Sequence, residues 1–225
     1  MIDISKLMPK MLTEEELMKA LTVLPEYDKE VRSKSETERL IALNDLYSVY
    51  VPNTMSTEVY SKMYLALIRS LNKKFSKNAV IQKNSSAGVI GGADSFTIMG
   101  CGGIGKSASI GRAVELIGEK RTILDENLNE VIPILSVQCP FDSSVKSLLL
   151  SILKTVDDVL VESDYYDKAL KVRATTDTLI SMVSKVALNP IGLLIVDEIQ
   201  NVVNSKNGRQ LVGPDSLKLY ANRYI

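Results

Sequence analysis

The sequence predicts an α/β fold in which a parallel sheet is flanked by helices and preceded by a helical N-terminal region. Two observations favour this class. Short apolar runs alternate with helical patterns through the second half of the chain, as in parallel sheets with helical crossovers. A glycine-rich loop ending in Lys-Ser follows the first of these runs. The composition agrees, because 225 residues with 45% hydrophobic content and 27 residues of each charge sign describe an ordinary soluble domain without a dominant nucleic-acid-binding field.

Residues 1–83 are expected to form the helical N-terminal region. Thr13 and Glu16 make a capping box for a short helix that ends at Leu24-Pro25. Ser35 and Glu38 repeat this box and begin a second helix that runs towards Pro52, and a third helix follows from Ser56. Apolar residues recur at helical spacing along the second and third helices, and we expect both stripes to pack into a core. The stripes are Leu40, Leu43, Leu46, Tyr47 and Tyr50, and Val59, Tyr60, Met63, Tyr64, Leu67 and Leu71.

A Gly/Ser-rich loop over residues 84–94 is expected to separate this region from an α/β core at 95–211, which an atypical tail at 212–225 follows. Within the core, the apolar runs predict strands at 96–99, 131–138 and 191–196. The amphipathic segments between them predict helices at 105–117, 143–156 and 175–188.

The strongest chemical signal is GCGGIGKS at residues 100–107, a complete G-x-x-x-x-G-K-[ST] phosphate-binding loop, or Walker A motif. Its glycines allow consecutive backbone N–H groups to turn towards one anion, and the following helix N-terminus adds partial positive charge. We expect Lys106 to reach the β- and γ-phosphates and the Ser107 hydroxyl to ligate Mg²⁺. The glycines expected to cradle the phosphates are Gly100, Gly102, Gly103 and Gly105.

The second signal is the apolar run at 191–196 that ends in Asp197 and Glu198, which is typical of the Walker B strand of a nucleotide-binding enzyme. We expect Asp197 to serve the Mg²⁺ shell and Glu198 to act as the base for an attacking water. The chain contains no His, so Glu198 is the obvious candidate for that role. An acidic turn after a buried strand is the structural alternative.

Weaker candidates carry polar groups near these motifs, and for each of them we consider a plain structural role the default. Gln200, Asn201 and Asn204 could orient water, and Asp94 with Gly91 and Gly92 precedes the first strand. Lys120, Arg121 and Lys146 could contact a nucleic-acid backbone but are expected to be solvated. The two cysteines, Cys101 and Cys139, have no metal-site spacing and are expected to be small packing residues.

Three stretches resemble AAA+ transposition regulators of the TnsC and TniB kind. They are SFTIMGCGGIGKS at 95–107, VQCPFDSSVKSL at 137–148 and IGLLIVDEIQNVV at 191–203. The leader at 21–52 resembles the segment that precedes the ATPase core in such proteins, so the resemblance spans roughly residues 20–205.

The resemblance implies an AAA+/ASCE P-loop fold that binds ATP at subunit interfaces, self-associates on DNA in the cytosol, and links a target-site selector to a transposase. It also implies, by position, that Lys106 and Ser107 are the Walker A contacts, Asp197 the Walker B metal residue and Glu198 the catalytic glutamate. No membrane association is expected.

After about Leu211 the family's sensor strand, arginine finger and lid have no match. Because the sensor strand of AAA+ folds lies between the phosphate-loop and Walker B strands, we expect an incomplete sheet. Its buried unpaired backbone groups would cost ~1–3 kcal/mol each. The expectation is a truncated form with weakened or absent ATPase activity. Alternatives are another P-loop NTPase, or a non-hydrolysing nucleotide-dependent module that recruits a partner through residues 1–75.

Overall fold

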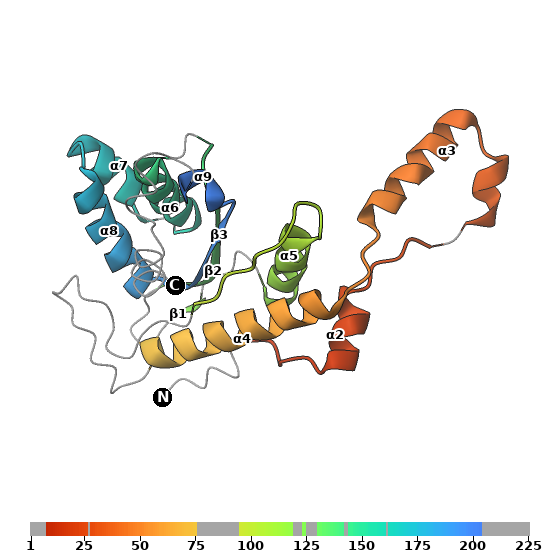
Figure 1. Cartoon of the computed structure of the whole chain (residues 1–225), viewed down its shortest axis with the longest axis horizontal. Helices are drawn as coiled ribbons and strands as arrows, with labels where there is room; N and C mark the ends of the chain where they lie inside the picture. The colour runs from red at the N-terminus through yellow and green to blue at the C-terminus, as the bar shows by residue number, and fades with distance from the viewer. Residues whose placement is uncertain are drawn as a thin grey trace.

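The computed structural model describes residues 8–26, 28–75, 95–118, 123–124, 130–141, 144–160 and 162–203. The predicted linker at 84–94 and tail at 212–225 lie outside these ranges. Several weaker candidates also lie outside them: Gly91, Gly92, Asp94, Lys120, Arg121 and Asn204. The described part is an α/β structure in which a short sheet lies between two groups of helices (Figure 1), so the predicted fold class is confirmed.

The centre of the structure is a pair of parallel strands, β2 (Glu130–Gln138) and β3 (Ile191–Asp197), paired from Ile132↔Ile191 to Gln138↔Asp197. The two-residue strand β1 (Ile123–Leu124) adds to the other edge of β2 in antiparallel orientation. Both long strands are rich in β-branched residues and leucine, as is usual for strands covered on both faces. Because the strands are parallel, the chain after β2 and the chain after β3 emerge at the same edge.

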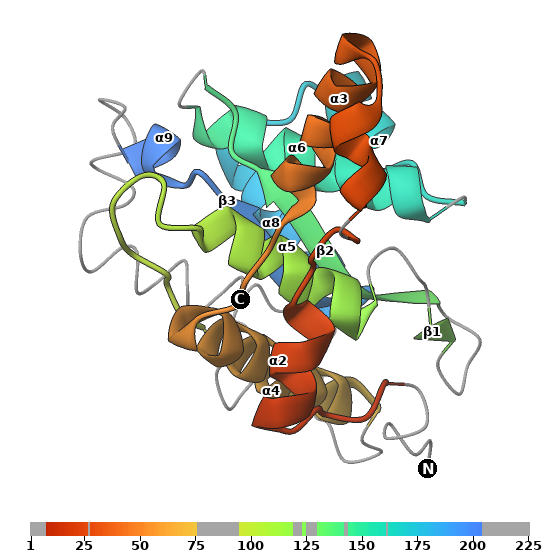
Figure 2. The same ribbon diagram turned by 90° about the vertical axis from the view of Figure 1, so that its right-hand side faces the viewer.

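One face of the sheet is covered by α4 (Thr54–Phe75) and α5 (Lys106–Ile117), with α2 (Glu14–Leu21) packed against both helices (Figure 2). The apolar stripe predicted for the third helix, which begins at Val59, lies buried here, so this expectation is confirmed. The contact between α4 and the sheet is close at Gly192. A Cβ there would lie 2.6 Å from the Pro133 carbonyl oxygen and 2.8 Å from Leu67 Cδ1. A larger residue at this position would therefore push α4 away from the strands.

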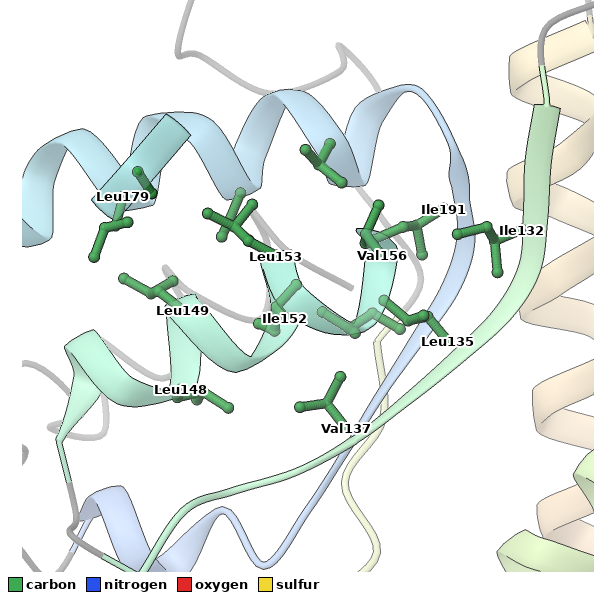
Figure 3. Packing of buried hydrophobic residues seen from close by; sticks show 14 of the residues in the cluster. Ile132, Leu135, Val137, Leu148, Leu149, Ile152, Leu153, Val156, Leu179 and Ile191 are labelled. Carbon is green, nitrogen blue, oxygen red and sulfur yellow. The ribbon is translucent and has the colours of Figure 1, made fainter. Parts of the chain in front are cut away.

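The other face of the sheet is covered by α6 (Val145–Val159) and α8 (Thr176–Leu188), and α7 (Tyr165–Lys171) packs against α6. Figure 3 shows Leu135 and Val137 from β2 facing Leu148 and Ile152 from α6. Successive strand residues point to opposite faces, so the β2 neighbours Ile134 and Leu135 enter different hydrophobic clusters. The sheet is therefore the middle of three layers, and its carboxyl edge is left to the loops.

Most elements of the predicted core are present, with ends shifted by up to three residues: α5, α6 and α8, and the strands β2 and β3. The short helix α7 was not predicted. Its first backbone N–H groups are capped from a distance, because the Asp157 carboxylate of α6 accepts from Tyr165 N at 3.0 Å and Tyr166 N at 2.7 Å. A seven-residue helix held by a cap from another element leaves little periodic signal in the sequence.

The prediction of a strand at 96–99 is wrong for the described structure. Residues 95–100 have no regular secondary structure and pair with no described strand, although Phe96 and Ile98 pack against the cluster that contains α4 and α5. Met99, in contrast, is 86% exposed. Apolar alternation predicts which side chains are buried, but a strand also requires a neighbouring backbone to complete its hydrogen bonds. Among the described strands, β3 pairs only with β2.

The apolar stripe predicted for the second helix, which begins at Leu40, is not buried, which corrects the expectation of core packing. The helix α3 (Glu36–Leu43) ends early and continues as the 3₁₀ helix η2 (Asn44–Ser48), and a further 3₁₀ helix, η1 (Lys29–Ser33), precedes it. We call η1, α3 and η2 the arm. Figure 1 shows it standing away from the three layers. A backbone bridge between Val23 and Tyr50 closes its base, and of the stripe only Tyr50 packs against the main core.

None of the helices in the described ranges combines the length and apolar character needed to cross a bilayer.

Candidate functional site

The loop at residues 100–105 turns the chain into α5 with two glycines in the left-handed region. Gly103 has φ +81° and Gly105 has φ +90°, values that residues with a Cβ rarely adopt. A Cβ built at either position would meet no atom within 4 Å, so the space beside the loop is open. These glycines are therefore needed for backbone conformation. Gly102 also faces open space, whereas a Cβ at Gly100 would lie 2.3 Å from Ile104 Cδ1.

The N-terminus of α5 differs from those of α2, α3, α6 and α8. Side-chain oxygens cap α2, α3, α6 and α8, but at the Gly105 cap of α5 no described side chain does so, and the first turn contains no acidic residue. The first backbone N–H groups of a helix have no intrahelical partner, and they lie at the positive end of its dipole. This end of α5 is therefore suited to receive an anion from outside the chain.

Lys106, the first residue of α5, folds back over the loop. Its Nζ donates to the Gly100 and Cys101 carbonyl oxygens, both at 2.9 Å. A phosphate oxygen would be a stronger acceptor than these neutral carbonyls. The ammonium group of Lys106 is thus held at the loop, where it can exchange these carbonyl oxygens for the oxygens of a bound phosphate. Cys101 is exposed, so the expectation that it packs is wrong, whereas Cys139 is buried as expected.

The two motifs meet where the Ser107 side chain contacts Asp197. The Ser107 Oγ donates to Asp197 Oδ2 at 2.9 Å, although the two residues are 90 positions apart in the sequence. The other oxygen of this carboxylate, Oδ1, accepts from the backbone N–H of Glu198 at 2.8 Å. Since β3 ends at Asp197 and α5 begins at Lys106, regular elements hold both side chains. The structure therefore brings a hydroxyl and a carboxylate together beside the phosphate-binding loop.

This pair fits part of a Mg²⁺ shell. In the described ranges, no group of three or more Asp, Glu, His or Cys residues is placed to hold a metal ion. Mg²⁺ does not need such a group, because it is commonly bound by one or two protein oxygens, with water and phosphate oxygens as the remaining ligands. Ser107 and Asp197 offer that kind of oxygen set.

Glu198 has a strained backbone, with φ +57° in the left-handed region. A non-glycine residue held there costs ~1–3 kcal/mol, and such strain is often found at functional sites. The left-handed turn ends β3 sharply, and α9 (Gln200–Val203) begins two residues later. Gln200 Nε2 donates to Glu198 Oε2, so the carboxylate is oriented by its neighbour.

The other predicted polar candidates have structural or solvated positions. Asn201 Nδ2 donates to the Cys139 carbonyl oxygen at 3.3 Å and thereby ties α9 to the end of β2. Lys146 is exposed on α6, as expected for a solvated residue.

A buried cluster of hydroxyl groups lies behind the site, and no sequence motif predicted it. Tyr50 Oη lies 2.7 Å from Ser56 Oγ and 3.0 Å from Ser109 Oγ, and the two serines are only 1% and 2% exposed. Ser109 is on α5, two residues after Ser107, and four residues before the fully buried Ala113. A serine on the apolar face of a helix is the signal that could have identified this cluster.

Arg112 reinforces the same connection between α5 and the leader. Its guanidinium carbon lies 5.6 Å from the centroid of the Tyr50 ring, and its Nη2 donates to the Ser48 carbonyl oxygen at 3.5 Å. The helix that begins at the phosphate-binding loop is thus joined to the base of the arm.

Comparison with protein families gives a match. A family profile described as the AAA domain matches residues 90–220, which is more than half of the chain and includes both motifs. A search of curated proteins found no match. AAA domains generally bind ATP with Mg²⁺ and commonly oligomerise. The phosphate-binding loop, the α5 N-terminus and the contact between Ser107 and Asp197 agree with that chemistry. The chain therefore belongs to the AAA domain family of P-loop ATPases.

Proposed function

We propose that this chain binds ATP and Mg²⁺ at the loop of residues 100–107 and at Asp197, and that it acts as a regulator of DNA transposition of the TnsC and TniB kind. The observation that carries the nucleotide site is the 2.9 Å contact between Ser107 and Asp197, which joins the two motifs. The transposition role is supported by the resemblance of the three sequence stretches around these motifs. In this role, assembly of the protein on DNA in the presence of ATP links target-site selection to the transposase.

Each site residue has a task that follows from its position. The N-terminus of α5 and the four loop glycines receive the phosphates, and Lys106 exchanges its two carbonyl acceptors for phosphate oxygens. Ser107 and Asp197 hold Mg²⁺, which, when bound, neutralises charge on the triphosphate. Glu198 accepts the proton of a water molecule at its carboxylate, and the Gln200 amide keeps that carboxylate in place.

Nucleotide binding tests the site directly. Titration of the full chain with ATP and Mg²⁺ by calorimetry should show binding, and Lys106→Ala should abolish it, because the variant removes the only side-chain charge held by the loop carbonyls in the described structure. Lys146→Ala is the matched control, since it removes an exposed lysine on α6 and should leave affinity unchanged. Retained ATP affinity in Lys106→Ala would refute the assignment.

The transposition role needs a separate measurement. Light scattering of the full chain with duplex DNA should show large assemblies with ATP and none without it. Assembly that is indifferent to DNA would count against this role while leaving the nucleotide site intact.

A second candidate is a nucleotide-dependent switch that binds ATP without turnover. It is favoured by residues 95–100, which lead into the phosphate-binding loop but join no described strand. Steady-state phosphate release separates the two candidates. Turnover that falls by ~100-fold or more in Glu198→Gln would support hydrolysis with Glu198 as the base. ATP binding without phosphate release, unchanged by this substitution, would support the switch.

A further inference from the structure

Three polar side chains in the first turn of α5 contact three different parts of the molecule. Lys106 donates to carbonyl oxygens of the phosphate-binding loop, and Ser107 donates to Asp197 at the end of β3. Ser109 instead lies with its Oγ 3.0 Å from the hydroxyl of Tyr50, a residue of the leader. The first turn of α5 is therefore joined to the loop, to the Walker B strand and to the segment that precedes the core.

Nucleotide binding, as proposed above, changes the first two of these contacts. Lys106 exchanges its carbonyl acceptors for phosphate oxygens, and Ser107 turns its hydroxyl oxygen towards Mg²⁺. The contact of Ser109 is not exchanged, because Ser109 is 2% exposed, whereas the space beside the loop glycines is open. Ser109 is thus the polar residue of the first turn that keeps its partners with and without nucleotide.

Ser109 also reaches the phosphate-binding loop through its backbone. Its N–H donates to the Gly105 carbonyl oxygen at 2.8 Å, which joins the first turn of α5 to the loop. Gly105 has φ +90° and provides no side-chain cap, so its own side chain does not restrict the loop conformation. The position of Ser109 therefore helps to select the loop conformation that receives the phosphates.

The leader holds Ser109 through groups that are themselves fixed. Tyr50 exchanges two backbone hydrogen bonds with Val23, both of 2.9 Å, at the base of the arm. Its hydroxyl also lies 2.7 Å from Ser56 Oγ, and Ser56 is tied to Asn53 at the start of α4. Figure 1 shows the arm joining the body beside α2 and the first turns of α4. The Tyr50 hydroxyl therefore connects the base of the arm to the helix that begins at the phosphate-binding loop.

We propose that Tyr50 is a positioning residue for the nucleotide site, and that ATP binding and docking of the leader on α5 favour each other. This inference rests on the proposed nucleotide site and adds to it a residue outside both motifs. While Tyr50 contacts Ser109, the first turn of α5 is held in the conformation that receives phosphate. Once the contact is lost, a smaller fraction of molecules is competent, and the apparent ATP affinity falls by that fraction. Because such coupling is reciprocal, bound ATP stabilises the leader contact by the same factor.

Calorimetric titration of the full chain with ATP and Mg²⁺ tests the positioning role. Tyr50→Phe and Ser109→Ala should each raise the ATP Kd by ~5-fold or more, which is the lower end of typical coupling between sites. The double variant should bind no more weakly than the weaker single variant, because both substitutions remove the same contact. A purely structural role would leave the Kd unchanged at a temperature where circular dichroism shows each variant to be folded.

Tyr64→Phe is the matched control for this titration. It is the same substitution and removes a hydroxyl of α4 that donates to the Pro9 carbonyl oxygen at 2.7 Å. Like Tyr50, Tyr64 thereby joins two parts of the N-terminal half, but its printed hydroxyl partner is a backbone carbonyl rather than Ser109. Tyr64→Phe should therefore lower the free energy of unfolding and leave the ATP Kd unchanged.

Amide hydrogen exchange of the wild-type chain tests the reciprocal effect without any substitution. The amides of Val23 and Tyr50 are bonded to each other's carbonyl oxygens, so their protection reports the docked leader. Saturating ATP with Mg²⁺ should raise this protection by the same factor, ~5-fold or more. The Tyr166 amide, which donates to Asp157 on the other side of the sheet, is the control and should not respond.

The outcomes separate this inference from the proposed nucleotide site. An ATP Kd within ~2-fold of wild type in both Tyr50→Phe and Ser109→Ala would overturn the positioning role and leave the site intact. Protection of the Val23 and Tyr50 amides that is indifferent to ATP would do the same. A wild-type chain that binds no ATP would overturn the site, and this inference with it. In Lys106→Ala, both amides should keep their protection without nucleotide and lose the response to ATP, which assigns the response to the bound nucleotide.

Discussion

The hydroxyl cluster behind the phosphate-binding loop should contribute measurably to the stability of the whole chain. Replacing Tyr50 by Phe removes one hydroxyl and leaves the ring in place beside Arg112. That hydroxyl contacts Ser56 Oγ at 2.7 Å and Ser109 Oγ at 3.0 Å. The serines lie 3.3 Å from each other and Ser56 also has Asn53 as a partner, so part of the bonding survives.

The expected loss is therefore that of one to two net hydrogen bonds at a buried site, or about 1–2 kcal/mol of unfolding free energy. Both serines are almost inaccessible to water, which places the loss above that of an exposed bond. For a chain of this size the shift in Tm is roughly 2–8 °C. Urea unfolding is best followed by circular dichroism, because the chain contains no Trp.

A double-mutant cycle with Ser109→Ala sharpens the test, because residues in one buried network should couple by at least ~0.5 kcal/mol. Tyr47→Phe is the control, since the Tyr47 ring is 90% exposed and the substitution retains its apolar area. It should change stability by less than ~0.5 kcal/mol. A Tyr50→Phe effect no larger than that of the control, or effects of Tyr50→Phe and Ser109→Ala that simply add, would refute the reasoning.

Two further predictions concern backbone conformation and pH. Gly105→Ala should lower the free energy of unfolding by ~1–2 kcal/mol, because φ is +90° at this position. Gly111→Ala should raise it by ~0.5–1 kcal/mol, because Gly111 lies within α5, has no positive φ and has open space where a Cβ would stand. Urea unfolding of both variants measures the contrast, and a stabilising Gly105→Ala would contradict the prediction. The capping box of α2 should weaken in acid, because the Thr13 backbone N–H and then its hydroxyl hold the pKa of Glu16 below its ordinary value of 4.5. A lowered folded-state pKa gives stability that is full above about pH 4.5 and is lost as pH falls through the folded-state pKa. Proton titration of Glu16 by NMR should give a midpoint below 4.5 that rises in Thr13→Ala, because this variant removes the hydroxyl and keeps only the backbone N–H, and equal midpoints in the two proteins would reject the explanation.

Many features of this chain could be predicted from the sequence because they depend on residues close together in it. The capping boxes at Thr13 and Ser35 join groups three residues apart, and both form as expected. The loop at 100–105 requires glycine for its backbone, and its connection to a helix follows from the same short segment. The run at 191–196 contains enough apolar residues to be buried in almost any α/β arrangement.

Tertiary structure decided which apolar surfaces are covered and which distant groups meet. The stripe that begins at Val59 is buried and the stripe that begins at Leu40 is exposed, although both have helical spacing. Periodicity shows that a helix has an apolar face, but burial depends on whether another element lies against it. Likewise, residues 96–99 have the composition of a strand without a paired neighbour. The carboxylate of Asp197 meets the Ser107 hydroxyl only because the parallel sheet and α5 bring them to one edge. The sequence by itself determined the residues capable of phosphate chemistry, and packing over a separation of 90 residues determined that they form one site.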